Sequence, residues 1–302
     1  MVLLLLSRGL FAPAAAEPAD LAKYRDVPWR YLQTIAGMGP RNPGSPGHQM
    51  LKEYILQTGR RFADAVVPQP FTHRVRGQAP VPLANIEMRF NGDSGAPILI
   101  GAHYDTRPFA DEEPDPTLRT RPIPGVNDGG SGTAVLLALA QLLHDHKPKN
   151  PVHLVFFDGE DYGAKGSSEY LLGSMHYARQ LRKGDKTQWP RAVVVIDMIG
   201  DKDLQIYRES HSVKSAPWLI DIIDRVARQK NNFRQFKSKA KYSILDDHYP
   251  FIARGIPSVL LIDFDYPHWH TQADTLDKCS SESLSAVFTV LADTLAELQT
   301  HD

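Results

Sequence analysis

One stretch of the chain, Pro151–Gly163, reads PVHLVFFDGEDYG and constrains the fold more than any other. Its first half, Val152–Phe157, is an apolar run of strand length, rich in β-branched and aromatic residues. Three carboxylates follow at once, Asp158, Glu160 and Asp161. Charged groups at the end of a buried strand are costly unless they hold something, and a metal ion is the first candidate. Because open α/β sheets place their chemistry at this end of their strands, the stretch predicts a buried strand with a site beside it.

The composition is that of a globular protein with no global electrostatic preference. Of the 302 residues, 42% are hydrophobic and 23% charged, and 34 Lys and Arg balance 35 Asp and Glu. The net charge of -1 provides no field that favours nucleic acid or an anionic membrane surface, so we expect neither as a partner. A single cysteine, Cys279, excludes an intrachain disulfide and a cysteine-based zinc site. Any zinc must therefore be held by histidine and carboxylates.

The first residues carry a short apolar run followed by small residues, in MVLLLLSRGLFAPAAAEPAD. That order resembles a secretory signal, although a positively charged start is missing and the apolar run is short. We interpret residues 1–16 as a signal peptide or a disordered tail, and residues 17–302 as a single α/β catalytic domain. The protein is then expected to be periplasmic or secreted. No other segment approaches the roughly 18 apolar residues of a membrane span, and we expect a monomer.

Strand-like and helix-like segments alternate along the chain. Beyond the first stretch, strands are expected at 65–72, 83–90, 97–103, 191–197, 204–208 and 256–263, and helices at 21–37, 47–62, 133–145, 167–181, 217–229 and 281–300. Such alternation is typical of a mainly parallel sheet with helices on both faces. The sequence therefore predicts an α/β fold of three layers, with a mostly parallel mixed sheet flanked by helices.

Several apolar runs end in, or lead directly into, side chains that bind metals. His103 closes one run, Asp197 closes another and His270 follows a third, while Asp128 lies in the glycine-rich GVNDGGSG segment that opens a helix. The carboxyl ends of parallel strands share one edge of a sheet, so these groups are expected within reach of a common centre. A set of histidine and carboxylates without cysteine suits zinc in an open, catalytic coordination.

The segment Phe109–Pro124 is polar and proline-rich, and carries the acids Asp111, Glu112, Glu113 and Asp115. It is too long and too polar for a core connection. Two interpretations stay open at this stage: a loop that covers the site, or a solvated insertion.

Six short motifs occur in order along these elements. They are HYD at 103–105, ND at 127–128, ED at 160–161, DMIG at 197–200, DDH at 246–248 and WHT at 269–271. With RNPGSPG at 41–47, they resemble the zinc aminopeptidase (zinc-exopeptidase-like) fold, and within it the glutaminyl cyclase branch, the animal-type glutaminyl-peptide cyclotransferases and their bacterial counterparts. Asp161 in place of the animal glutamate, and the absence of the disulfide cysteines, fit a bacterial member.

The resemblance implies a zinc-dependent acyltransferase with one Zn²⁺ per chain. Its substrates would be peptides and proteins with N-terminal glutamine, which it would convert to pyroglutamate with release of ammonia. By the same resemblance, Asp128, Asp161 and His270 would ligate zinc, and Glu160 would be the general acid/base. Adjacent residues of an extended chain point in opposite directions, which agrees with separate roles for Glu160 and Asp161.

The resemblance also implies that Asp197 and Asp246 form a hydrogen-bonded acid pair near the substrate amine, and that Trp269 forms a wall of the pocket. The remaining candidates are Phe264 and Tyr266, as pocket rim or turn packing, Arg107, as substrate contact or surface ion pair, and His103, as ligand of a second metal.

Two other functions compete with the cyclase. A zinc aminopeptidase would use two zincs to hydrolyse N-terminal residues, and His103, Asp128 and Asp197 are the ligands that a second zinc would need. The DDH motif and Trp269 favour the cyclase. A zinc-binding ectodomain without catalysis is the third interpretation. Glu160 argues against it, because a protein without activity has no need for an acid beside a metal ligand.

Overall fold

Six strands form the central sheet of the structure, a computed structural model that describes residues 20–75, 77, 79–181, 185–230 and 234–300. They are β1 (Ala65–His73), β2 (Val81–Phe90), β3 (Ile98–His103), β4 (Val152–Phe157), β5 (Ala192–Asp197) and β8 (Ser258–Ile262). Their order is β1-β2-β4-β3-β5-β8. The pairs among β4, β3, β5 and β8 are parallel, and the pairs β1–β2 and β2–β4 are antiparallel. The predicted mixed sheet is confirmed. The expected signal peptide lies outside the described residues.

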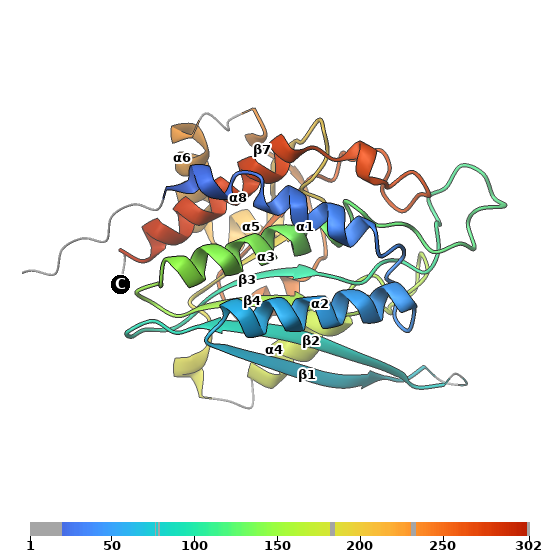
Figure 1. Cartoon of the computed structure of the whole chain (residues 1–302), viewed down its shortest axis with the longest axis horizontal. Coiled ribbons are helices and arrows are strands. Elements are labelled where there is room, and N and C mark those ends of the chain that lie inside the picture. Colours follow the sequence, from blue (N-terminus) through green and yellow to red (C-terminus); the bar gives the residue numbers. More distant parts are fainter. Residues whose placement is uncertain (1–19, 76, 78, 182–184, 231–233, 301–302) are drawn as a thin grey trace, which may run out of the picture.

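Helices cover both faces of this sheet, which is why the central strands are apolar on both sides. The longer helices are α1 (Val27–Ala36), α2 (Pro46–Phe62), α3 (Gly130–Asp145), α4 (Leu172–Leu181), α6 (Pro217–Gln229) and α8 (Ser281–Leu298), and the shorter ones are α5 (Ser210–Ser215) and α7 (Tyr249–Ile252). Helices α1, α2, α3, α6 and α8 share one hydrophobic cluster with one face of the sheet. Helices α4 and α7 share a second cluster with the other face (Figure 1).

Strand β5 illustrates how the sequence builds this arrangement. Val194 and Ile196 belong to the first cluster, and Val193 and Val195 belong to the second. Alternate residues of a strand point to opposite faces, so a continuous apolar run is what a sheet between two helical layers requires. The three predicted layers are therefore present.

A small parallel sheet of β6 (Ile206–Glu209) and β7 (Phe236–Tyr242) lies apart from the main one. The sequence did not predict β7, which reads FKSKAKY. Only Phe236 of this strand is buried, and three lysines occupy its exposed length. Lysine is typical of edge strands, where it discourages pairing with a strand of another chain. With so many lysines, β7 lacks the apolar pattern by which a strand is recognised in a sequence.

The register of the main sheet gathers the predicted site at one edge. His103 pairs with Phe157 across β3 and β4, and Asp197 pairs with Ile262 across β5 and β8. The residues that end or follow these four strands therefore leave the sheet on the same side. Within the described part of the chain, no helix has the length and apolarity needed to span a membrane.

Candidate active site

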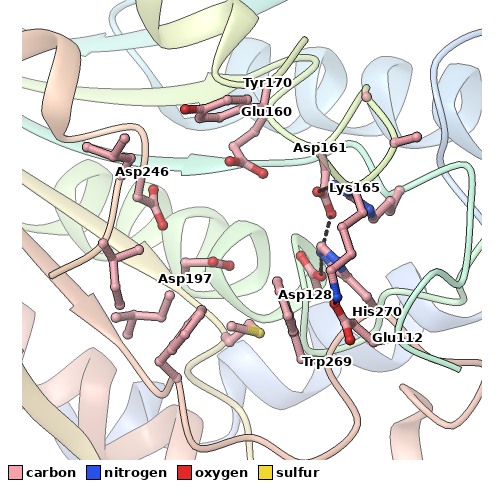
Figure 2. A pocket seen from close by; sticks show the side chains of 18 of the residues that line it. Glu112, Asp128, Glu160, Asp161, Lys165, Tyr170, Asp197, Asp246, Trp269 and His270 are labelled. Atoms are coloured by element: carbon pink, nitrogen blue, oxygen red, sulfur yellow. Dashed lines mark hydrogen bonds and ion pairs between the residues drawn. The ribbon is translucent and has the colours of Figure 1, made fainter. Parts of the chain in front are cut away.

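A cavity of about 260 Å³ opens at the carboxyl edge of the parallel strands. Most of the predicted site residues line it, namely Arg107, Asp128, Glu160, Asp161, Asp197, Asp246, Phe264, Trp269 and His270. Figure 2 shows Glu160, Asp246 and Asp197 on one side, with Asp128, Asp161 and His270 on the other. The topology thus brings together side chains that lie as far apart as Arg107 and His270 in the sequence.

Asp128, Asp161 and His270 form a group that fits a metal ion. All three are buried, and their ligand atoms lie within 4.8 Å of one another. His270 Nε2 is 3.2 Å from Asp161 Oδ2 and 3.5 Å from Asp128 Oδ2. Both of these carboxylate oxygens are buried without a hydrogen-bond donor. Two unpartnered carboxylate oxygens facing an imidazole nitrogen are costly unless a cation binds between them, and three ligands leave a fourth zinc position open.

A second group, His103, Asp128 and Asp197, lies directly beside the first. His103 Nε2 is 3.1 Å from Asp197 Oδ1 and 3.2 Å from Asp128 Oδ1. Asp128 belongs to both groups and turns one oxygen toward each of them. Burial alone would lower the pKa of His103, but Asp197, Asp105 and Asp128 raise it well above its ordinary value. The second-metal candidate predicted from the sequence therefore lies where a second cation could bind.

Hydrogen bonds of two aspartates, Asp105 and Asp158, fix the turn after β4. Asp105 accepts the backbone N–H groups of Glu160 and Asp161, both at 3.1 Å. Asp158 accepts a hydrogen bond from the Tyr104 hydroxyl at 2.9 Å, and its other oxygen lies 2.8 Å from His48 Nε2. These bonds hold the backbone of the turn, and the side chains of Glu160 and Asp161 line the cavity. Asp158 therefore supports the turn rather than lining the cavity.

Glu160 is surrounded by other acids, and this changes its protonation. Burial, followed by the charges of Asp161, Asp247 and Asp246, raises the pKa of Glu160 well above its ordinary value. Burial and the neighbouring Asp197 and Asp247 act in the same direction on the pKa of Asp246. Carboxyl groups with raised pKa values are suited to general acid/base catalysis near neutral pH.

Trp269 closes one wall of the cavity, as predicted. Its ring stacks on His270, with ring centroids 4.0 Å apart, and lies 5.5 Å from the ring of Phe264. Phe264 is 38% exposed, which places it on the rim. His270 and Met198, both at the cavity, have positive φ angles of 52° and 45°. Such strain in non-glycine residues persists only where the surroundings enforce it, and it concentrates at functional sites.

Comparison with known proteins identifies the family. The sequence profile of peptidase family M28 matches residues 85–295. The chain belongs to peptidase family M28. Among its relatives, a glutaminyl-peptide cyclotransferase of Drosophila melanogaster is 27% identical, over 84% of this chain and 76% of that protein.

Two solved structures have the same TM-score of 0.85. A glutaminyl cyclase from Fimbriiglobus ruber is 30% identical and covers 93% of this chain and 97% of its own. A leucine aminopeptidase precursor from Bacteroides thetaiotaomicron is 26% identical and covers 90% of this chain and 96% of its own. Family membership confirms the resemblance drawn from the motifs, the zinc-exopeptidase-like fold and zinc as the cofactor.

Of the two places considered for Tyr266, the pocket rim and the packing of the turn, the structure shows a packed one. Its side chain is 3% exposed, and its hydroxyl donates to Asp274 at 2.8 Å. Asp274 in turn accepts the backbone N–H groups of Asn127 and Asp128. The structure therefore excludes the pocket-rim alternative for Tyr266, which packs behind the loop that carries Asp128. The residues Phe264 and Tyr266 leave the same turn, and the sequence alone does not tell which of them faces the cavity.

The acidic run Asp111–Glu113 contacts His270 and the residues after it. Of the two interpretations of the 109–124 segment, a loop at the site or a solvated insertion, the structure shows the first. Asp111 Oδ1 is 3.4 Å from His270 Nδ1, and the backbone N–H of Glu112 donates to the His270 carbonyl at 3.3 Å. Glu113 accepts the backbone N–H of Gln272 at 2.8 Å. The sequence signal for this role was an acidic cluster in an otherwise proline-rich segment.

Glu209 fixes the segment that carries Asp246. It is buried at the end of β6, accepts the backbone N–H of Ile244 at 3.2 Å, and lies 3.2 Å from His248 Nε2. Burial raises the pKa of Glu209, but hydrogen bonds from His248 and from two backbone N–H groups lower it to about 2. Glu209 thus joins His248 and the backbone of Ile244, on either side of Asp246.

The lowered pKa predicts a pH-dependent contribution to stability. Since the pKa is lower in the folded state, Glu209 stabilises the protein fully above about pH 4.5, and this stabilisation is lost as the pH falls toward 2. Glu209→Gln is expected to lower the free energy of unfolding by on the order of 3 kcal/mol at pH 7. Urea unfolding at pH 7 and pH 2.5 measures this. Glu53→Gln, at an exposed ion pair, is the control. An equal loss at both pH values would contradict the assignment.

Proposed function

We propose that the protein is a glutaminyl-peptide cyclotransferase, which converts N-terminal glutamine of peptides and proteins to pyroglutamate and ammonia. One observation carries the proposal: the cyclase-like residues Asp246 and Trp269 line the same cavity as Glu160 and the proposed zinc ligands. The likeness to glutaminyl cyclases over most of the chain supports it. Asp128, Asp161 and His270 would hold the zinc, with one ion per chain. Bound there, zinc would polarise the γ-amide carbonyl of the substrate glutamine.

The proposed proton carrier is Glu160. As the substrate α-amine bonds to the γ-carbonyl carbon, the Glu160 carboxylate accepts a proton from that amine. As the bond between that carbon and the amide nitrogen breaks, Glu160 returns the proton and ammonia leaves. Atoms balance without an attacking water. The cavity wall of Trp269 and Phe264 limits the room for water beside the reacting atoms.

Asp246 and Asp197 are proposed to bind the substrate amine and the leaving nitrogen. Both acids line the cavity on the side of Glu160 (Figure 2). Asp197 also contacts His103 at 3.1 Å, and Asp246 accepts the backbone N–H of Asp247. These partners restrict how each acid can turn, and they leave the substrate amine facing an acidic surface.

A peptide assay tests the reaction. We expect a peptide with N-terminal glutamine to lose one molecule of ammonia per chain and to keep all of its residues, as mass spectrometry and an ammonia assay would measure. A matched peptide with N-terminal leucine should stay intact. The proposal would be contradicted if the leucine peptide released free leucine and the glutamine peptide released no ammonia. This result would favour a zinc aminopeptidase, for which the complete His103, Asp128 and Asp197 group is the supporting observation.

Two finer points belong to the same proposal. The order of apolar and small residues in residues 1–16 supports export, so we propose a periplasmic or secreted enzyme. We also propose that it acts as a monomer, because all proposed site residues come from one chain. Cell fractionation would test the location, and light scattering of the purified protein would test the monomer.

A further inference from the structure

We propose that Arg107 and Asp111 act as a positioning pair for two zinc ligands, Asp161 and His270. The inference rests on the ligand set of the proposed function but not on which reaction the enzyme performs. It replaces the substrate contact considered for Arg107, and it gives the acidic run of the 109–124 loop a role in the site.

Arg107 determines which oxygen of Asp161 is available to the metal. Its Nη1 donates to Asp161 Oδ1 at 2.7 Å. Asp161 Oδ2 has no donor and faces His270 Nε2 at 3.2 Å. One oxygen is therefore occupied by the guanidinium, and the other is directed to the ligand group. A short aspartate has few ways to reach a metal, and this contact selects one of them.

Asp111 does the corresponding work for His270. Its Oδ1 is 3.4 Å from His270 Nδ1, on the opposite side of the ring from the nitrogen that faces Asp128 and Asp161. A carboxylate at one imidazole nitrogen fixes the ring and leaves the other nitrogen to the metal.

The two residues also hold each other. Arg107 Nε donates to both carboxylate oxygens of Asp111, at 3.0 Å each. The Arg107 side chain is 10% exposed, and two carboxylates accept from its Nε and Nη1. These two contacts are to Asp111 and to a proposed zinc ligand. A single guanidinium joins the ligand Asp161 to the carboxylate that orients the ligand His270.

Charge alone predicts a different outcome from positioning. Removing the positive Arg107 near a dication should strengthen zinc binding by electrostatics, and removing the negative Asp111 should weaken it. Positioning predicts that both changes weaken it, because each frees one ligand. Substitutions at these outer contacts commonly reduce metal affinity by about 10- to 100-fold.

Zinc dissociation constants of the full chain decide between these possibilities. We expect Arg107→Met and Asp111→Asn each to raise the constant by about 10- to 100-fold, measured by competition with a chromogenic chelator. The double variant should lose little more than either single one, because the two residues act as a unit. Cobalt-substituted protein gives a second readout, since its visible spectrum reports the geometry of the ligands.

Another ion pair at the same cavity provides matched controls. Lys165 pairs with Glu112 rather than with a proposed ligand side chain. Lys165→Met and Glu112→Gln therefore remove the same charges nearby, and each is expected to change the zinc constant by less than about 3-fold. Tighter or unchanged zinc binding in Arg107→Met would overturn the proposal. Melting of the metal-free variants shows whether they are folded. If zinc binding follows the expectation and no ammonia is formed, the pair stands and the proposed reaction fails.

Discussion

Replacing Glu160 by glutamine is expected to lower turnover of N-terminal glutamine peptides by about 10²- to 10⁴-fold while zinc stays bound. Glutamine keeps the size of the side chain but cannot accept a proton from the substrate amine. Burial and the acids around Glu160 raise its pKa, which makes its carboxylate a better acceptor for the proton of the substrate amine. The loss should therefore fall mainly on kcat, because the residue is needed as the bonds change rather than to bind the peptide.

Turnover and zinc content must be measured on the same preparation. Zinc per chain is expected to equal that of the unsubstituted protein, since the proposed ligands are Asp128, Asp161 and His270. Glu169→Gln is a suitable control, because Glu169 follows on the same loop and is partly exposed. We expect it to keep nearly full turnover. Loss of zinc from Glu160→Gln would mean that Glu160 and Asp161 have exchanged roles.

The sequence predicted the parts of the site whose signal is local. An apolar run that ends in an acid is visible in a few residues, so β4, β5 and their aspartates could be recognised. The parallel arrangement then placed these ends at one edge without further information. Glu160 and Asp161 could be given separate roles because neighbouring side chains diverge.

The parts of the site that the sequence did not predict depend on hydrogen bonds between side chains and backbone groups that are distant in the sequence. Asp105 and Asp274 accept N–H groups from the turns that carry Glu160 and Asp128. No pattern in the sequence records these acceptors, because what they recognise is a backbone group that every residue except proline possesses. The sequence left two places open for Tyr266 for the same reason, since its partner Asp274 is fixed by backbone N–H groups of Asn127 and Asp128. The position of Glu160 at the cavity is thus predictable from the sequence, and the backbone contacts that support it are not.

Arg41 is the largest of these supports. It is fully buried, and its guanidinium donates to backbone carbonyl groups of the segments that carry the ligands. The acceptors are Tyr104 at 3.2 Å, Pro124 at 3.0 Å, Asp128 at 3.1 Å and Gly125. Burial lowers the pKa of Arg41 to about 10, partly offset by Asp274, Asp128 and Asp105, so the group remains charged at neutral pH. Arg41, which precedes α2, therefore holds together the residue after β3 and the glycine-rich loop.

Arg41→Met is accordingly expected to lower the free energy of unfolding by about 4 kcal/mol or more, because several buried carbonyls lose their donor at once. The free energy of unfolding of Arg41→Lys should lie between those of Arg41→Met and the unsubstituted protein, since lysine keeps the charge but offers a single donor group. Arg60→Met, at an exposed ion pair with Glu53, should change stability by less than about 1 kcal/mol. Urea unfolding of the metal-free proteins measures all three. Equal midpoints for Arg41→Met and Arg60→Met would show that the ligand loops hold together without this guanidinium. A large loss would show that the position of Asp128 depends on a residue 87 positions earlier in the chain.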